Sequence, residues 1–391
     1  MPTLDVAMPL VLLLVVTAAV LLYKRAEKKL KASMEAQEFK TNDILLFVVV
    51  LVVVISTIVL TSFLNPDSMF ENVLMSIFLG SYTMLLFTTT HLFSGLKKKS
   101  AQLFSIGIGI VSLIAGIASL LPDLQDPATT FRVGAFFALS IACFAIAAYE
   151  QKKADDKKVK WYIAAQPPAL FLLIFVFFNI LHYAGTLNIW FPYVLDVFGA
   201  TFAILIILYL SPIFNWRNVW IFAAFLTLID IILVFSGPMV AAANTFTDLG
   251  LPVIIYLPNV PTYLNAAGDI AFRGLGLGDF FFAGILAVQT FNKFGKKYGY
   301  ASIVAMVLSF TIWEIFLTDI LTFLSGVLPF FDGGGFPATV FVITGWIPVA
   351  IIGVLMHRNK KESSSSLLVD IVENDAEELS QNQKELGLVQ K

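Results

Sequence analysis

Long apolar runs separated by short polar connections constrain the fold of this chain more than any other feature of its sequence. A helix of roughly 20 apolar residues crosses the hydrocarbon core of a bilayer. Backbone groups in lipid must be hydrogen-bonded within their own segment, which makes each run a helix. The sequence therefore predicts an all-α polytopic membrane protein with eleven spans, at 4–23, 44–64, 73–94, 103–121, 133–149, 162–183, 188–210, 219–240, 274–292, 300–326 and 337–356.

Composition agrees with this class and excludes several others. Of the 391 residues, 58% are hydrophobic and 13% are charged, and the mean hydropathy is +0.86. Soluble domains are roughly half apolar and a quarter charged. The net charge of -2 offers no basic surface for nucleic acid. The single cysteine, Cys143, lies in an apolar run, which rules out a disulfide framework and a thiolate metal site.

Lys and Arg residues alternate between rich and poor connections along the chain. Three to six of them occur in each of the connections 24–43, 95–102, 150–161, 293–299 and 357–361, and one or none in the connections between these. By the positive-inside rule, the N-terminus lies outside and the C-terminus in the cytoplasm. The acidic tail is expected to be cytoplasmic and mostly disordered, because it combines many charges with few aromatic residues.

Five acidic residues lie inside the apolar runs, where an ionised group costs roughly 2.5–3.5 kcal/mol or more: Asp196, Asp230, Asp279, Glu314 and Asp319. Asp230 and Asp279 belong to consecutive, antiparallel spans, so their depths can be compared from one membrane face. At 1.5 Å per residue, Asp230 lies about 10 Å from a helix end at Gly237-Pro238, and Asp279 about 8 Å from a helix start at Gly274. We expect the two carboxylates to face each other.

Facing carboxylates in a dry site suit two kinds of chemistry. They cannot easily both ionise, so one of them keeps a proton. The charged carboxylate can then act as a general base toward water while the protonated one polarises a peptide carbonyl, which is aspartyl proteolysis. Acids at this depth also form ion or proton pathways in transporters. Depth alone leaves both functions open.

Small residues surround the second of these aspartates. Gly276-Leu277-Gly278-Asp279 forms a Gly-x-Gly-Asp motif, Asp230 lies in the preceding span, and Pro337-Ala338-Thr339 opens the last span. Together these residues resemble the presenilin and signal peptide peptidase family of intramembrane aspartyl proteases, in its archaeal type. The chain departs from the family pattern at Thr339, where Leu is usual, and at Ile229, where Tyr is usual.

The resemblance implies a set of functional residues and partners. Asp230 and Asp279 would be catalytic, and the motif and substrate-binding residues would be Gly276, Leu277, Gly278, Pro337, Ala338 and Thr339. The substrates would be transmembrane helical proteins or signal peptides, hydrolysed with water and without cofactor or metal. The protein would lie among the lipids of a prokaryotic cell membrane. Partner subunits are not indicated by the sequence.

The resemblance also implies an organisation of the chain. The family core has nine spans, which makes the first two spans additions to a presenilin-like core. The expected divisions are 1–72 for these extra helices with their basic connector, 73–218 for the N-terminal part of the core, 219–356 for the catalytic region and 357–391 for the tail.

A segment with high β-propensity lies between the two aspartate spans. Val253-Ile254-Ile255-Tyr256-Leu257 is bracketed by Pro252 and Pro258. A substrate helix must unwind before a peptide bond reaches the aspartates, and pairing with this strand, including Ile254, would satisfy its exposed backbone groups. A loop that merely covers the site is the alternative.

The remaining polar residues are expected to be structural, and other protease classes find little support. Asp196 opens a span, Glu314 and Asp319 lie on nearly opposite sides of one helix, and His91 and His182 suit interfaces or core hydrogen bonds.

The sequence contains no His-Glu-x-x-His motif of a metalloprotease and no Gly-x-Ser-Gly motif of a rhomboid-type serine protease. A GxGD prepilin peptidase and an ion- or proton-coupled transporter stay open as alternatives.

Overall fold

The computed structural model of the chain describes residues 5–33, 80–87, 98–120, 127–149, 193, 195–235, 252–262, 270–327 and 335–358. The predicted spans 44–64 and 162–183 and the tail beyond 358 lie outside these residues. Of the predicted span 73–94, only 80–87 is described.

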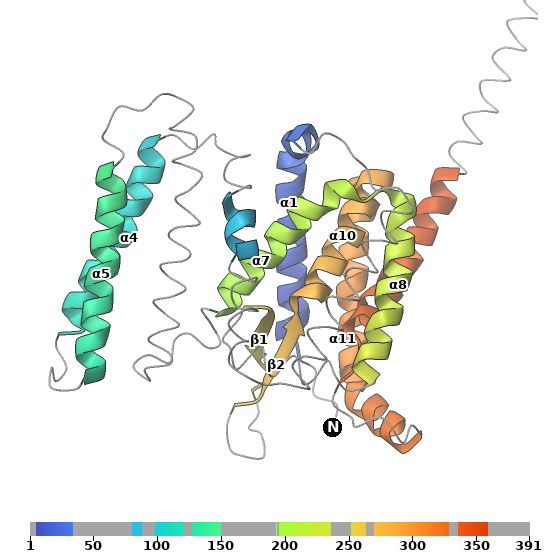
Figure 1. The fold of residues 1–391 in the computed structure, drawn as a ribbon. Coiled ribbons are helices and arrows are strands. Elements are labelled where there is room, and N and C mark those ends of the chain that lie inside the picture. The colour runs from blue at the N-terminus through green and yellow to red at the C-terminus, as the bar shows by residue number, and fades with distance from the viewer. Residues whose placement is uncertain are drawn as a thin grey trace, which may run out of the picture.

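Helices make up most of the described residues (Figure 1). The long ones are α1 (Ala7–Ser33), α4 (Lys98–Ala118), α5 (Pro127–Tyr149), α7 (Leu195–Leu210), α8 (Trp216–Phe235), α10 (Leu277–Phe294) and α11 (Lys296–Val327), followed by the C-terminal helix, Ala338–Arg358. Within the described residues, five helical stretches are long and apolar enough to cross a membrane: Ala7–Glu27, Leu195–Ile213, Trp216–Phe235, Lys296–Val327 and Ala338–Arg358. The prediction of a helical membrane protein is thus supported, whereas the nine-helix core stays a prediction.

The start of α10 differs from the sequence prediction. The predicted span begins at Gly274, but residues Phe272–Gly276 form strand β2 and the helix begins only at Leu277. The reason is backbone pairing: the segment 272–276 hydrogen-bonds with strand β1 (Ile254–Pro258), which a helix would prevent. Asp279 consequently lies in the first turn of α10.

The β-hairpin connects the region after α8 to the start of α10. Its strands are antiparallel, with Ile254 opposite Gly276 and Leu257 opposite Arg273. Side chains alternate between two faces of such a hairpin, and Ile255 and Leu275 are both buried on the same face. The backbone N–H of Leu277 donates to the Val253 carbonyl (2.9 Å), so the strand pairing continues into the first residue of α10.

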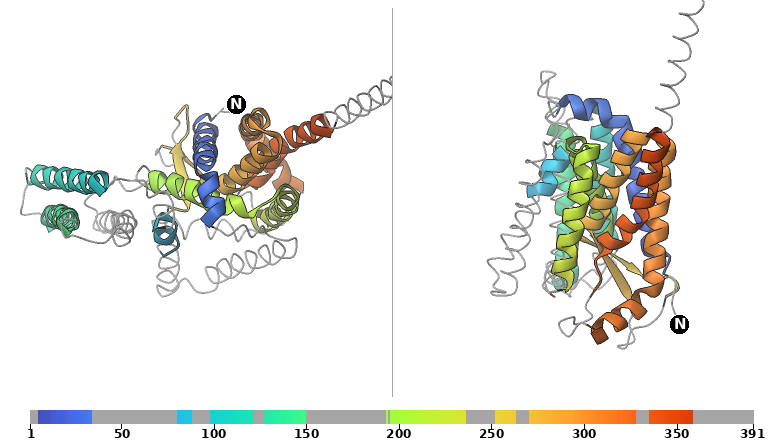
Figure 2. Two further views of the ribbon diagram at one scale, coloured as in Figure 1. Left: turned by 90° about the horizontal axis from the view of Figure 1, so that it is seen from above. Right: turned by 90° about the vertical axis from the view of Figure 1, so that its right-hand side faces the viewer.

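Helix α10 occupies the centre of the packed bundle (Figure 2). It packs against α1, α7, α8 and α11, and every residue from Phe280 to Phe291 is buried. A Cβ added at Gly284 would overlap the side chain of Ile207 on α7, so glycine is what lets these two helices approach closely. The first turn of α10 is therefore held by helices on several sides.

Helices α4 and α5 form an antiparallel pair on one side of the bundle (Figure 1). Ser105 donates to the Cys143 carbonyl (2.9 Å), and Ser140 donates to the Gly109 carbonyl (2.9 Å). A Cβ at Gly109 would lie 3.1 Å from the Phe144 ring. Small residues and hydrogen bonds from Ser hydroxyl groups between helices are typical of helix pairs in membranes.

The directions of α1, α8, α10 and the C-terminal helix agree with the alternation predicted for the corresponding spans. At one end of the bundle, Asp5 before α1 accepts a hydrogen bond from Val260, just after β1. At the other end, the Lys24 ammonium lies 4.4 Å from the centre of the Phe291 ring near the end of α10. Trp216 at the start of α8 and His357 in the C-terminal helix both contact Phe294 at this second end. Which end faces the cytoplasm stays a prediction.

Candidate active site

Asp230 and Asp279 lie on two different helices. Asp230 lies in the second half of α8, and Asp279 lies in the first turn of α10. Both side chains are partly buried. The two carboxylates lie near enough for their charges to interact, and that they face each other stays a prediction. Their catalytic role stays a prediction.

A third segment contributes a hydrogen bond to this pair. Thr339 lies in the first turn of the C-terminal helix and is 3% exposed. Its hydroxyl Oγ1 donates to Oδ2 of Asp230 over 2.6 Å. The position at which the chain departs from the family pattern is therefore in direct contact with one of the two aspartates.

Aromatic stacking holds this third segment in place. Phe336, Phe341 and Trp313 stack on one another, with ring centres 5.3–5.5 Å apart and interplanar angles of 13–25°. Pro337, which is buried, and the half-buried Ala338 lie between Phe336 and Thr339. Trp313 belongs to α11, so α11 positions the Pro337-Ala338-Thr339 segment beside α8. Such offset stacks add to the energy of apolar burial.

The Gly-Leu-Gly residues before Asp279 have distinct surroundings. A Cβ at Gly276 would lie 3.4 Å from Oδ2 of Asp279, so glycine leaves room beside this carboxylate. Leu277 is buried, and its Cδ2 lies near Gly199 of α7. Gly278 is exposed and faces open space. Ile254 lies directly opposite Gly276 in the hairpin, at the strand end nearest Asp279.

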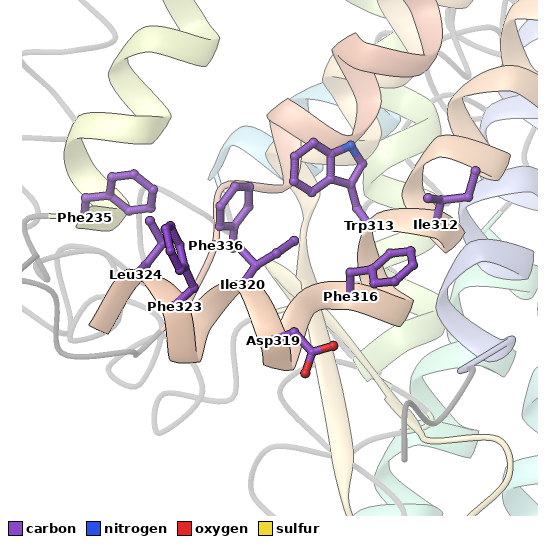
Figure 3. A pocket seen from close by; sticks show the side chains of 9 residues that line it. All are labelled: Phe235, Ile312, Trp313, Phe316, Asp319, Ile320, Phe323, Leu324 and Phe336. Atoms are coloured by element: carbon purple, nitrogen blue, oxygen red, sulfur yellow. The ribbon is translucent and has the colours of Figure 1, made fainter. Parts of the chain in front are cut away.

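An apolar pocket of about 810 Å³ lies along α11, beside the end of α8 and the residue before Pro337 (Figure 3). Five aromatic side chains contribute to its lining, together with aliphatic residues and Asp319: Phe235, Ile312, Trp313, Phe316, Asp319, Ile320, Phe323, Leu324 and Phe336. Phe235 lies on α8 little more than one turn after Asp230, and Phe336 precedes the Pro337-Ala338-Thr339 segment. The carboxylate of Asp319 points away from the aromatic rings (Figure 3).

Asp196, which was expected to be structural, positions the hairpin. It lies in the first turn of α7, and its Oδ1 accepts a hydrogen bond of 2.6 Å from the backbone N–H of Tyr256 in β1. Only the sheet register shows that this N–H points away from β2. In the sequence, the only signal for this hydrogen bond is an acidic residue at the start of a span.

Glu314 has a partner that sequence reasoning missed. Its Oε1 accepts a hydrogen bond of 3.0 Å from Nη1 of Arg273 on β2, 41 residues earlier in the chain. In the sequence Arg273 is a single charge beside a predicted span, and its long-range partner cannot be read from local spacing. Among the described residues, no group of three or more His, Cys, Asp and Glu side chains could hold a metal ion.

Comparison with known proteins adds no assignment to this geometry. The sequence matches no model of a known protein family and no curated protein. The resemblance to presenilins and signal peptide peptidases therefore depends on the motif residues alone.

Proposed function

We propose that this protein is an intramembrane aspartyl protease of the presenilin and signal peptide peptidase type, with Asp230 and Asp279 as its catalytic pair. One observation carries the proposal: three segments far apart in the sequence meet at one place. They are α8 with Asp230, the β2–α10 junction with Asp279, and the Pro337-Ala338-Thr339 segment, whose hydroxyl contacts Asp230. These are the three segments that the resemblance predicts to form the site.

The hydrogen bonds support a distinct catalytic role for each of the two carboxylates. A hydroxyl donor stabilises a carboxylate more than a neutral carboxylic acid, so Thr339 favours Asp230 as the charged member of the pair. Asp230 then takes a proton from water as the hydroxyl oxygen attacks the peptide carbonyl. Asp279 donates a hydrogen bond to the carbonyl oxygen. Asp230 then passes the proton that it took from water to the leaving amine as the C–N bond breaks.

The hairpin offers an edge for an unwound substrate, and that edge belongs to β2. The hydrogen bonds between the two strands are made by the odd-numbered residues of β1, in phase with the bond from the Asn259 N–H to the Ala271 carbonyl. The backbone groups of the even-numbered residues of β1 therefore point away from β2. On the outer edge of β1, the Tyr256 N–H is taken by Asp196 and Pro258 has no N–H. Gly274 on β2 is exposed, and its backbone groups point away from β1.

This arrangement refines the prediction for Ile254. The strand predicted around Ile254 is present, but its inner edge pairs with β2 and its outer edge is occupied at Tyr256. A substrate strand paired at Gly274 would run along β2, which leads directly into the turn that carries Asp279. The apolar pocket between α8 and α11 would then receive apolar side chains of the substrate.

A transporter is the less well supported alternative. In that function Asp230, Asp279 and Glu314 would form one ion path, but Glu314 is engaged by Arg273. A GxGD prepilin peptidase shares the motif at Asp279, but the resemblance includes the Pro337-Ala338-Thr339 segment as well. Both alternatives predict no cleavage of a simple transmembrane helix.

The test is proteolysis by the pure full-length protein in detergent. The substrate is a synthetic transmembrane helix, and mass spectrometry of the products should show two fragments whose summed mass exceeds that of the substrate by one water. Asp230→Ala and Asp279→Ala should each abolish cleavage, because neither carboxylate can perform both proton transfers. The fold should persist in both variants, as judged by unchanged elution in size-exclusion chromatography.

Glu27→Gln is the control, because Glu27 lies on α1 at the end of the bundle away from the hairpin, where it forms a partly exposed ion pair with Lys24. This variant should retain cleavage. Substantial turnover by either aspartate variant would overturn the proposal, as would ion flux in proteoliposomes without any cleavage.

A further inference from the structure

A second polar cluster lies away from the two aspartates, where the start of α1, the far end of the hairpin and α11 meet. Its members are Asp5, Asn259, Arg273 and Glu314, of which Asp5 is 4% exposed, Asn259 2% and Glu314 7%. Asn259 follows β1 and Arg273 belongs to β2. Their backbones place both side chains on the sheet face that carries the buried Ile255 and Leu275.

Each of three residues in this cluster has a buried oxygen atom to which no described residue donates a hydrogen bond. Asp5 Oδ1 accepts from the N–H groups of Ala7 (3.1 Å) and Val260 (3.0 Å), but Asp5 Oδ2 has no partner. Glu314 Oε1 accepts from Arg273, but Oε2 has none, and Oδ1 of Asn259 has none either. Buried acceptors normally have a partner, so three in one cluster require an explanation.

The charges of the cluster do not balance. Among the described residues, the cluster holds two carboxylates, those of Asp5 and Glu314, and one guanidinium, that of Arg273, which already pairs with Glu314. Two carboxylates and one guanidinium leave one negative charge in a buried place, which is costly unless it is compensated. A water molecule would satisfy an oxygen atom but would not compensate this charge.

We propose that Asp5, Asn259 and Glu314 bind a monovalent cation, with Na⁺ as the ion that fits best. All three free ligands are oxygen atoms, which are the ligands of hard cations. A single excess negative charge matches one positive charge. A divalent ion would leave one positive charge uncompensated in the same buried place.

The bound cation would connect three elements, α1, β1 and α11, through its ligands. Asp5 precedes α1, Asn259 follows β1, and Glu314 lies in the middle of α11. Binding therefore stabilises the folded protein and holds the hairpin against α1 and α11. This inference does not depend on the proposed protease function, because it concerns the stability of the fold.

The experiment is thermal unfolding of the purified full-length protein in detergent, followed by tryptophan fluorescence. NaCl is titrated against choline chloride at constant ionic strength and pH, since choline is too large for a buried site. Tm should rise saturably with Na⁺, by about 2–4 °C at concentrations well above Kd. K⁺ should give a smaller rise and choline none.

Three variants sharpen the test. Asp5→Asn removes the excess charge and keeps the shape, so it should lose the response to Na⁺ while remaining at least as stable as the parent in choline. Asn259→Leu removes one ligand oxygen and should weaken the apparent affinity at least tenfold. Asp319→Asn, which removes an exposed acid from the same helix as Glu314, should respond like the parent.

The proposal is overturned if the parent has the same Tm in Na⁺ and in choline, which would mean that water alone fills the cluster. An Na⁺ response that survives in Asp5→Asn would overturn it as well. So would stabilisation by lower pH without any difference between Na⁺ and choline, because the excess charge would then be neutralised by a proton.

Discussion

At the scale of single residues, Thr339 distinguishes this chain from the family that it resembles. A leucine at this position offers only apolar contact, whereas the Thr339 hydroxyl donates to Oδ2 of Asp230 over 2.6 Å. Hydrogen bonds to a charged acceptor are worth roughly 1.5–3 kcal/mol. The site therefore contains a donor that the motif alone would not predict.

We expect Thr339→Val, which keeps the shape and removes the hydroxyl, to lower kcat for a transmembrane peptide about tenfold or more, because the charged form of Asp230 loses its donor. Thr339→Ser keeps the donor and should stay within a few-fold of the parent. Steady-state kinetics with one peptide give kcat and KM for all three proteins. Equal kcat for the Val and Ser variants would contradict a role for the hydroxyl.

At the scale of elements, close helix contacts position the three segments of the site. Gly284 lets α10 approach Ile207 of α7, and Gly345 of the C-terminal helix lies against the α11 backbone. A Cβ at Gly345 would lie 2.7 Å from the Cα of Met306. Since Thr339 lies on the same helix as Gly345, this contact also helps to fix the position of Thr339 relative to α11.

Replacement of Gly345 by alanine should destabilise the protein by about 1–3 kcal/mol, because the backbone of α11 cannot move aside as a side chain can. Gly326→Ala provides the matched control: Gly326 is also helical, but an added Cβ meets nothing within 4 Å. That variant should be unchanged or more stable by up to about 1 kcal/mol through helix propensity. Thermal unfolding in detergent measures both, and equal stability of the two variants would disprove the close contact.

At the scale of the whole molecule, the arrangement separates two chemically different ends. The hairpin, Asp5 and the Arg273–Glu314 pair lie at one end, and Lys24 and the ends of α10 and the C-terminal helix lie at the other. The second end carries the lysines on which the predicted orientation depends. If that end is cytoplasmic, the arrangement is that of signal peptide peptidases, which favours substrate helices with a cytoplasmic N-terminus.

Cysteine labelling on intact cells tests this orientation, in a background where the buried Cys143 is replaced by alanine. Thr262→Cys, after the first strand, should react with a membrane-impermeant thiol reagent from outside. Lys296→Cys, at the start of α11, should react only after the cells are permeabilised. Both positions are exposed. The reverse pattern would invert the topology, and labelling of both from outside would contradict the fold itself.

The sequence by itself determined the helical membrane class and the positions of most described helices. It also singled out Asp230 and Asp279 as acids inside apolar runs. These features depend on local or periodic properties: apolar length, the cost of an acid in lipid, and short motifs around Asp279. It also predicted the β-prone segment at Ile254, because β-branched and aromatic residues cluster there between two prolines.

Only the tertiary structure decided which residues meet. The start of α10 was wrongly predicted at Gly274, because the apolar run continues without a break through three residues that in the fold pair with β1: Gly274, Leu275 and Gly276. The bond from Thr339 to Asp230 joins residues 109 apart, and that from Arg273 to Glu314 joins residues 41 apart. Local patterns carry no information about such partners, because helix packing and sheet register determine which side chains come within hydrogen-bonding distance.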